Sequence, residues 1–180
     1  MRRDLTKNLV LAGLFVALGY ILPFVTGHIP SIGNMLLPMH IPVLIAGFVL
    51  GGKYGLIIGF IVPILRSLTL GMPPLFPTAI AMAFELATYG LMTGLLYRAL
   101  SKKKINIYVS LIGAMLIGRL VWGAITYVLL GLNGTAFTFQ MFIAGAFVNA
   151  VVGIVLQILI IPPIIMALKS AGHLVAERGY

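Results

Sequence analysis

The chain has 180 residues, of which 61% are hydrophobic and only 8% are charged. Soluble domains carry about 25% charged residues, so the composition excludes a soluble protein and indicates a single integral membrane domain over residues 1–180. The net charge of +9 does not indicate nucleic-acid binding, because the basic residues lie between apolar segments and form no stripe on a soluble face. The absence of cysteine excludes disulfides and any cysteine-based metal site or nucleophile.

Apolar segments follow one another along the chain and predict six transmembrane helices. Their approximate ranges are 8–26, 36–52, 54–70, 78–99, 106–131 and 138–168. A crossing needs about 20 apolar residues, so the second and third segments are short, and four crossings plus a re-entrant pair is the alternative. The last segment is long, and Pro162-Pro163 is expected to kink it or to end its regular part.

Lysine and arginine occupy alternate gaps between these segments. Basic residues lie before the first segment, at Lys53, at residues 98–104 and after the last segment, whereas the intervening gaps hold none. Short loops rich in Lys and Arg stay in the cytoplasm. The pattern therefore predicts six crossings with both termini cytoplasmic, and Lys53 favours two full crossings over a re-entrant pair.

Some charges lie inside the apolar segments, where ionisable groups are costly and usually functional. Helix rise places these and several polar or aromatic residues in the outer half of the membrane, which predicts an apolar ligand pocket with a few polar groups, open to the outside. The predicted ligand-binding residues are Arg66, Glu85, Arg119, Trp122, Tyr127 and Asn149.

Each charge also has a structural alternative. Glu85 and Arg119 can form a pair that only neutralises its charges, and Arg66 is close enough to the interface to snorkel. If Arg66 faces inward, two arginines against one glutamate leave a net +1 that suits a ligand carboxylate. His40 is expected to cap a helix or to hydrogen-bond locally and not to bind a metal.

Enzyme signatures are absent from the sequence. It contains no Gly-x-Ser-x-Gly, no His-Glu-x-x-His and no phosphate-binding Gly-x-x-x-x-Gly-Lys-[Ser/Thr]. We therefore expect no catalytic residue, no metal site, no cofactor and no ATP hydrolysis by this chain alone.

Small residues recur at four-residue spacing, which lets helices approach closely. Gly13 and Ala17 do so in the first segment, and Gly47, Gly51, Gly55 and Gly59 do so across the second and third. Either internal packing or a partner-facing surface accounts for such a stripe.

Two stretches resemble the substrate-binding S components of energy-coupling factor (ECF) vitamin transporters. They are Met35-Leu-Leu-Pro-Met-His-Ile-Pro-Val-Leu44 and residues 66–90, which include Met-Pro-Pro-Leu-Phe-Pro, and they are most similar to pantothenate-type members. The resemblance covers the whole chain in length and topology. Where the family has two alanines four residues apart in its first helix, this chain has Gly13 and Ala17, which keeps the small face.

The resemblance implies a six-helix S-component bundle in the cell membrane of a prokaryote. It implies a vitamin ligand bound from outside, a transmembrane coupling subunit and two ATPase subunits as partners, docking through Gly13 and Ala17, and inward release as the S component topples within the bilayer. The competing classes are a stand-alone secondary transporter of a small organic solute and a non-transport membrane scaffold. A secondary transporter commonly shows inverted repeats and broken helices, and neither is clear here.

Overall fold

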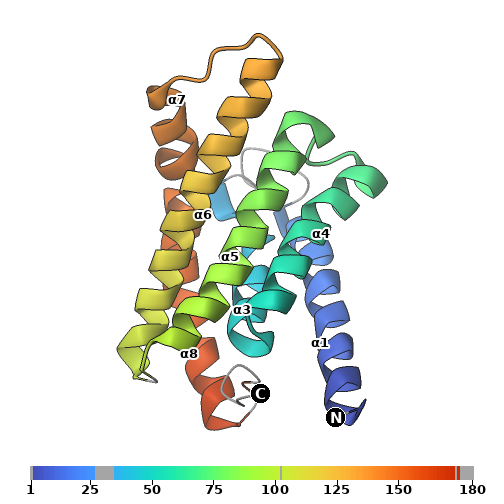
Figure 1. The fold of residues 1–180 in the computed structure, drawn as a ribbon, viewed down its shortest axis with the longest axis vertical. Coiled ribbons are helices and arrows are strands. Elements are labelled where there is room, and N and C mark those ends of the chain that lie inside the picture. Colours follow the sequence, from blue (N-terminus) through green and yellow to red (C-terminus); the bar gives the residue numbers. More distant parts are fainter. Residues whose placement is uncertain (1, 27–34, 102, 173, 175–180) are drawn as a thin grey trace.

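The computed structural model describes residues 2–26, 35–101, 103–172 and 174, and these form a helical bundle (Figure 1). In chain order the elements are α1 (Arg2–Ile21), the 3-10 turn η1 (Leu22–Thr26), α3 (His40–Leu50), α4 (Gly52–Leu70), the π-helical turn η2 (Leu75–Ala79), α5 (Ile80–Ala99), α6 (Lys104–Leu132), α7 (Phe139–Ile143), the π-helical turn η3 (Ala144–Val148) and α8 (Val151–Ser170). Helices suit a bilayer because each satisfies its own backbone polar groups.

Five helical stretches are long and apolar enough to cross a membrane, namely Leu5–Phe24, Gly52–Leu70, Leu75–Ala99, Lys104–Leu132 and Phe139–Ser170. With η2 counted as part of the α5 stretch, and α7 and η3 as part of the α8 stretch, the described residues form six helices, which confirms the predicted all-helical fold. The shortness expected of two helices holds for α3 alone. The 19 residues of α4 make it a candidate span by itself, which does not support the re-entrant pair.

The short helix α3 lies at the centre of the bundle. It packs against α1, α4, α5 and α8, and nine of its residues are buried, including His40, Leu44 and Phe48. Its 11 residues extend about 16 Å, less than a hydrocarbon core of about 30 Å. Because neighbouring helices cover α3, its ends are not required to reach both membrane surfaces.

Glycines set the spacing between α4 and α5, the pair of helices that pack most extensively. A side chain at Gly90 would overlap the backbone of Gly55, and one at Gly94 would overlap the backbone of Gly52. A side chain at Gly59 would likewise overlap the backbone of Leu86. Of the two explanations for the glycine stripe of the second and third segments, internal packing therefore holds for Gly55 and Gly59.

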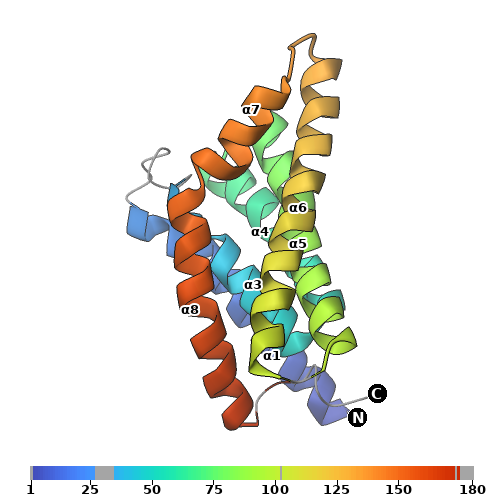
Figure 2. The same cartoon turned by 90° about the vertical axis from the view of Figure 1, so that its left-hand side faces the viewer.

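Two helix boundaries differ from the prediction. The second helix begins at His40 and not near residue 36, because Leu37 has a positive φ of 50° and Pro38 follows it. The regular structure of the last segment is interrupted at residues 144–150, and α8 then continues through Pro162-Pro163 to Ser170. Of the two effects expected of the prolines, an end of the regular helix is therefore wrong, and a kink stays a prediction. Figure 2 shows α7 inclined to α8 across this interruption.

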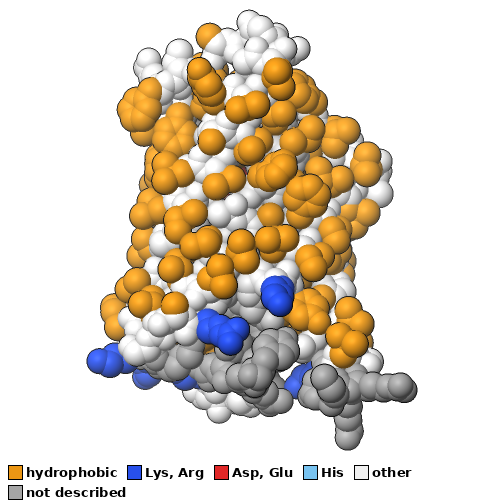
Figure 3. All heavy atoms as spheres, viewed as in Figure 1, with side chains coloured by type: hydrophobic (Ala, Val, Ile, Leu, Met, Phe, Trp, Pro, Cys, Tyr) orange, Lys and Arg blue, Asp and Glu red, His pale blue; other side chains and the backbone are white. Residues whose placement is uncertain are grey.

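The described lysine and arginine side chains on the surface gather at the end of the bundle where α1 begins and α8 ends (Figure 3). They include Lys7, Lys53, Arg98 and Lys104, all exposed. This clustering agrees with the charge alternation along the chain, which predicts that this end faces the cytoplasm.

We expect a single cysteine to report this orientation, because the chain has none of its own. A cysteine at Asn133, in the turn after α6, should react with an impermeant thiol reagent in intact cells, whereas one at Ser101, before α6, should react only after lysis. Equal labelling of the two positions, or the reverse order, would contradict cytoplasmic termini.

Candidate ligand-binding site

Three helices bring ionisable side chains together in the interior of the bundle. Arg119 of α6 places its Nη1 2.9 Å from Oε1 of Glu85 on α5, and His40 of α3 places its Nε2 3.7 Å from Oε2 of the same carboxylate. All three side chains are almost completely buried. A carboxylate with a guanidinium at contact distance avoids the large cost of an isolated buried charge.

Tyr89 extends this cluster, because it lies one helical turn after Glu85 on the same face of α5. It is fully buried, and its ring lies edge-on to the His40 ring with 5.6 Å between the centroids. The Tyr89 hydroxyl interacts with the Glu85 carboxylate, whereas Nε and Nη2 of Arg119 have no hydrogen-bond partner among the described residues. Buried donors are normally satisfied, so an acceptor on a ligand that reached the two Arg119 nitrogens would complete their hydrogen bonds.

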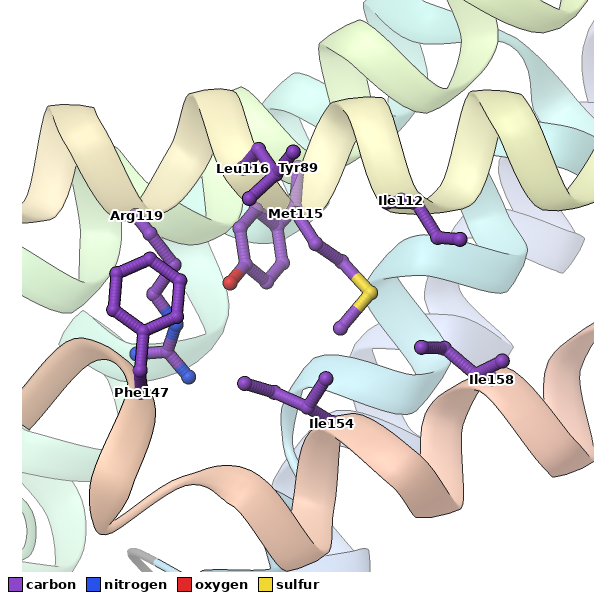
Figure 4. Close-up of a pocket in the computed structure, with 8 residues that line it drawn as sticks. All are labelled: Tyr89, Ile112, Met115, Leu116, Arg119, Phe147, Ile154 and Ile158. Carbon is purple, nitrogen blue, oxygen red and sulfur yellow. The ribbon is translucent and has the colours of Figure 1, made fainter.

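A cavity of about 190 Å³ lies against this cluster (Figure 4). Apart from Tyr89 and Arg119, its lining is apolar and comes from α6, η3 and α8: Ile112, Met115, Leu116, Phe147, Ile154 and Ile158. An apolar pocket with a few placed polar groups is the usual form of a small-molecule site. Of the six predicted ligand-binding residues, Arg119 lines this cavity directly, and Glu85 supports Arg119 from behind.

Arg66 lies elsewhere, against the end of α1. Its Nη1 donates a hydrogen bond to the backbone oxygen of Tyr20, and its guanidinium carbon lies 5.6 Å from the Tyr20 ring centroid and 5.3 Å from that of Phe24. The last carbonyls of a helix carry partial negative charge, and aromatic faces attract cations. The end of α1 therefore offsets the Arg66 charge.

The position of Arg66 changes the charge balance expected of the pocket. The neighbouring Val62 packs on Gly19 of α1, so this face of α4 is directed at α1. Arg66 is not among the residues that line the described cavity, and the one charged residue in that lining, Arg119, is paired with Glu85. The net +1 that depended on an inward Arg66 is absent there.

The remaining predicted residues lie in the C-terminal half of α6 and at the interruption before α8. Trp122 belongs to an aromatic cluster with Phe137 and Phe142, whose ring centroids lie 6.0 Å and 6.4 Å from its own. Phe142 in turn contacts Phe147, which lines the cavity. Tyr127 is 64% exposed, and Asn149 is exposed in the turn after η3, so neither lines this cavity.

Two residues of the cluster were missed by the sequence analysis. His40 was expected to act locally, yet its ring nitrogens make no hydrogen bond among the described residues, and its side chain faces Glu85. A histidine inside an apolar segment was a signal by itself, since such residues usually mark functional sites. Tyr89 was detectable from its four-residue spacing after Glu85.

The small face of α1 is open. Gly13 and Ala17 are exposed, and a side chain added at Gly13 would meet no described atom within 4 Å. Large apolar neighbours on the same surface, including Leu9, Val10 and Leu14, are also exposed. Within the described part of the chain, this face of α1 has no intramolecular partner.

These features define a multi-pass helical membrane protein with an internal, largely apolar ligand cavity. The family described as "ECF transporter, substrate-specific component" matches residues 7–165. The chain belongs to this family and is a substrate-binding membrane subunit of a transporter, not an enzyme. Such S components work with the subunits of an ECF energising module. No curated protein and no solved structure matches the chain.

Proposed function

We propose that this S component captures an acidic vitamin, with pantothenate as the first candidate, and that its carboxylate binds Arg119. The observation that carries the proposal is a pair of buried, unpartnered donor atoms, Nε and Nη2, on Arg119, whose side chain borders an apolar cavity. Hydrogen bonds between a guanidinium and a carboxylate are among the stronger polar contacts in proteins. The apolar wall suits the geminal dimethyl group of pantothenate.

Glu85 and His40 hold Arg119 in place in this proposal. Nη1 of Arg119 lies 2.9 Å from Oε1 of Glu85. This contact fixes the guanidinium and leaves its other two nitrogens for the ligand. Trp122 acts through the aromatic cluster that ends at Phe147 and so shapes the outer wall of the cavity. Tyr127 and Asn149 remain candidates for contacts along the path from outside, since neither lines the described cavity. Arg66 is instead held at the end of α1.

Substitution of the two arginines by lysine tests the site, because lysine keeps the charge but lacks the planar fork of donors. We expect Arg119→Lys to weaken pantothenate binding about tenfold or more, which corresponds to about 1.4 kcal/mol. Arg66→Lys is the matched control and should bind like the parent. Isothermal titration of the purified chain gives both affinities. A loss of pantothenate affinity in Arg66→Lys alone would indicate that the carboxylate binds at the end of α1.

Transport also needs the energising module, for which we propose a transmembrane coupling subunit and two ATPase subunits. The open face around Gly13 and Ala17 supports docking on α1, because small residues let a partner helix approach closely. Co-purification of an ATPase with this chain from its native membrane tests this part of the proposal independently of the ligand.

A further inference from the structure

The cavity beside Arg119 opens sideways, between α6 and α8. Ile112 and Leu116 line it and are also 41% and 50% exposed on the surface of the bundle. Figure 4 looks between the two helices into the cavity, with Tyr89 of α5 behind it. In a protein that crosses the bilayer, an exposed apolar surface of this kind meets lipid chains. The cavity is therefore accessible from the hydrocarbon of the membrane.

The two ends of this cavity differ in chemistry. The Tyr89 hydroxyl and the Arg119 guanidinium lie toward one end, and Ile112 and Ile158 lie toward the other (Figure 4). Arg119 and Ile112 are two turns apart on α6, so the ends are separated by about 10 Å. The cavity surface itself is apolar, and the buried donors lie beside one end of it. The cavity thus suits an elongated apolar molecule with a single acceptor group that can reach these donors.

We propose that the cavity takes an amphiphilic monocarboxylate from the bilayer, with the head on Arg119 and Tyr89 and the aliphatic body between α6 and α8. The inference rests on the proposed function, because it uses the same site and narrows the substrate class to acids with an apolar body. A phospholipid does not fit, because its two acyl chains and its headgroup are far larger than a cavity of about 190 Å³.

Octanoate is a suitable probe, with octylamine as a cation of the same length. For the full chain in lipid nanodiscs, calorimetry should show saturable binding of octanoate above that of empty nanodiscs, and none of octylamine. Ile158→Trp fills the apolar end and should weaken octanoate binding about tenfold or more. Leu159→Trp is the matched control, because Leu159 is the next residue of α8 and is 65% exposed. Tyr89→Phe removes one donor and should also weaken octanoate binding.

The outcomes separate the inference from the proposed function. The inference is overturned if octanoate binding does not saturate or if octylamine binds equally well. It is also overturned if Ile158→Trp and Leu159→Trp weaken octanoate binding to the same extent. Pantothenate binding without octanoate binding overturns the inference and leaves the proposed function standing. A chain that binds octanoate but never co-purifies with an ATPase supports the site and contradicts the proposed transport role.

Discussion

Glu85→Ala is expected to lower the free energy of unfolding by about 3–5 kcal/mol, the usual cost of removing one partner from a buried ion pair. Arg119 is only 5% exposed and has Glu85 at 2.9 Å as its carboxylate partner. The substitution leaves this guanidinium charged, buried and without a counter-ion among the described residues. Thermal unfolding of the purified variant in detergent should show a large fall in melting temperature.

Removing both charges tests whether the loss at Glu85 comes from the pair. Replacing a buried ion pair by apolar residues is often neutral or even stabilising, so Glu85→Ala combined with Arg119→Met should be more stable than Glu85→Ala alone. The same double variant should still lose pantothenate binding, because the Arg119 donors beside the cavity are gone. Additive losses of stability would mean that the two residues do not interact.

The helices could be predicted because the bilayer leaves few alternatives. Long apolar runs must satisfy their own backbone groups, and their ends follow the basic residues and the Pro- and Gly-rich gaps. The predictions failed where local backbone geometry determines whether a helix is interrupted. Nothing in the composition of residues 138–168 distinguishes the π-helical turn at Ala144–Val148 from a continuous helix. Pro162 and Pro163, which were expected to kink or end the helix, lie within α8.

The sequence predicted which charged residues belong to the site, but not which way their side chains point. An acid inside the membrane requires a nearby base, which indicates Glu85 with Arg119 from the sequence alone. Whether Arg66 turns toward the same cavity depends on which face of α4 meets α1, and that is fixed by contacts such as Val62 against Gly19. His40 joins Glu85 only through the central position of α3, a tertiary feature that no local spacing encodes.

Leucine substitutions at two glycines should have opposite effects on folding and on transport. Gly90 lies where α5 touches the backbone of α4, so Gly90→Leu forces the two helices apart and should yield no folded protein in detergent. Gly13 is open, so Gly13→Leu should fold at least as well as the parent, since glycine is about 1 kcal/mol less favourable than alanine inside a helix. Ala17→Leu, on the same face, should behave like Gly13→Leu.

The decisive measurement is uptake by the two folded α1 variants. If the open face of α1 receives the coupling subunit, a leucine at Gly13 or Ala17 holds the partner helix away while the cavity between α5, α6 and α8 is untouched. Ligand affinity and melting temperature should then equal those of the parent, whereas uptake and co-purification with the coupling subunit should be abolished. Normal uptake by both variants would place the docking surface elsewhere, and a joint loss of stability and binding would mean that this face packs within the bundle.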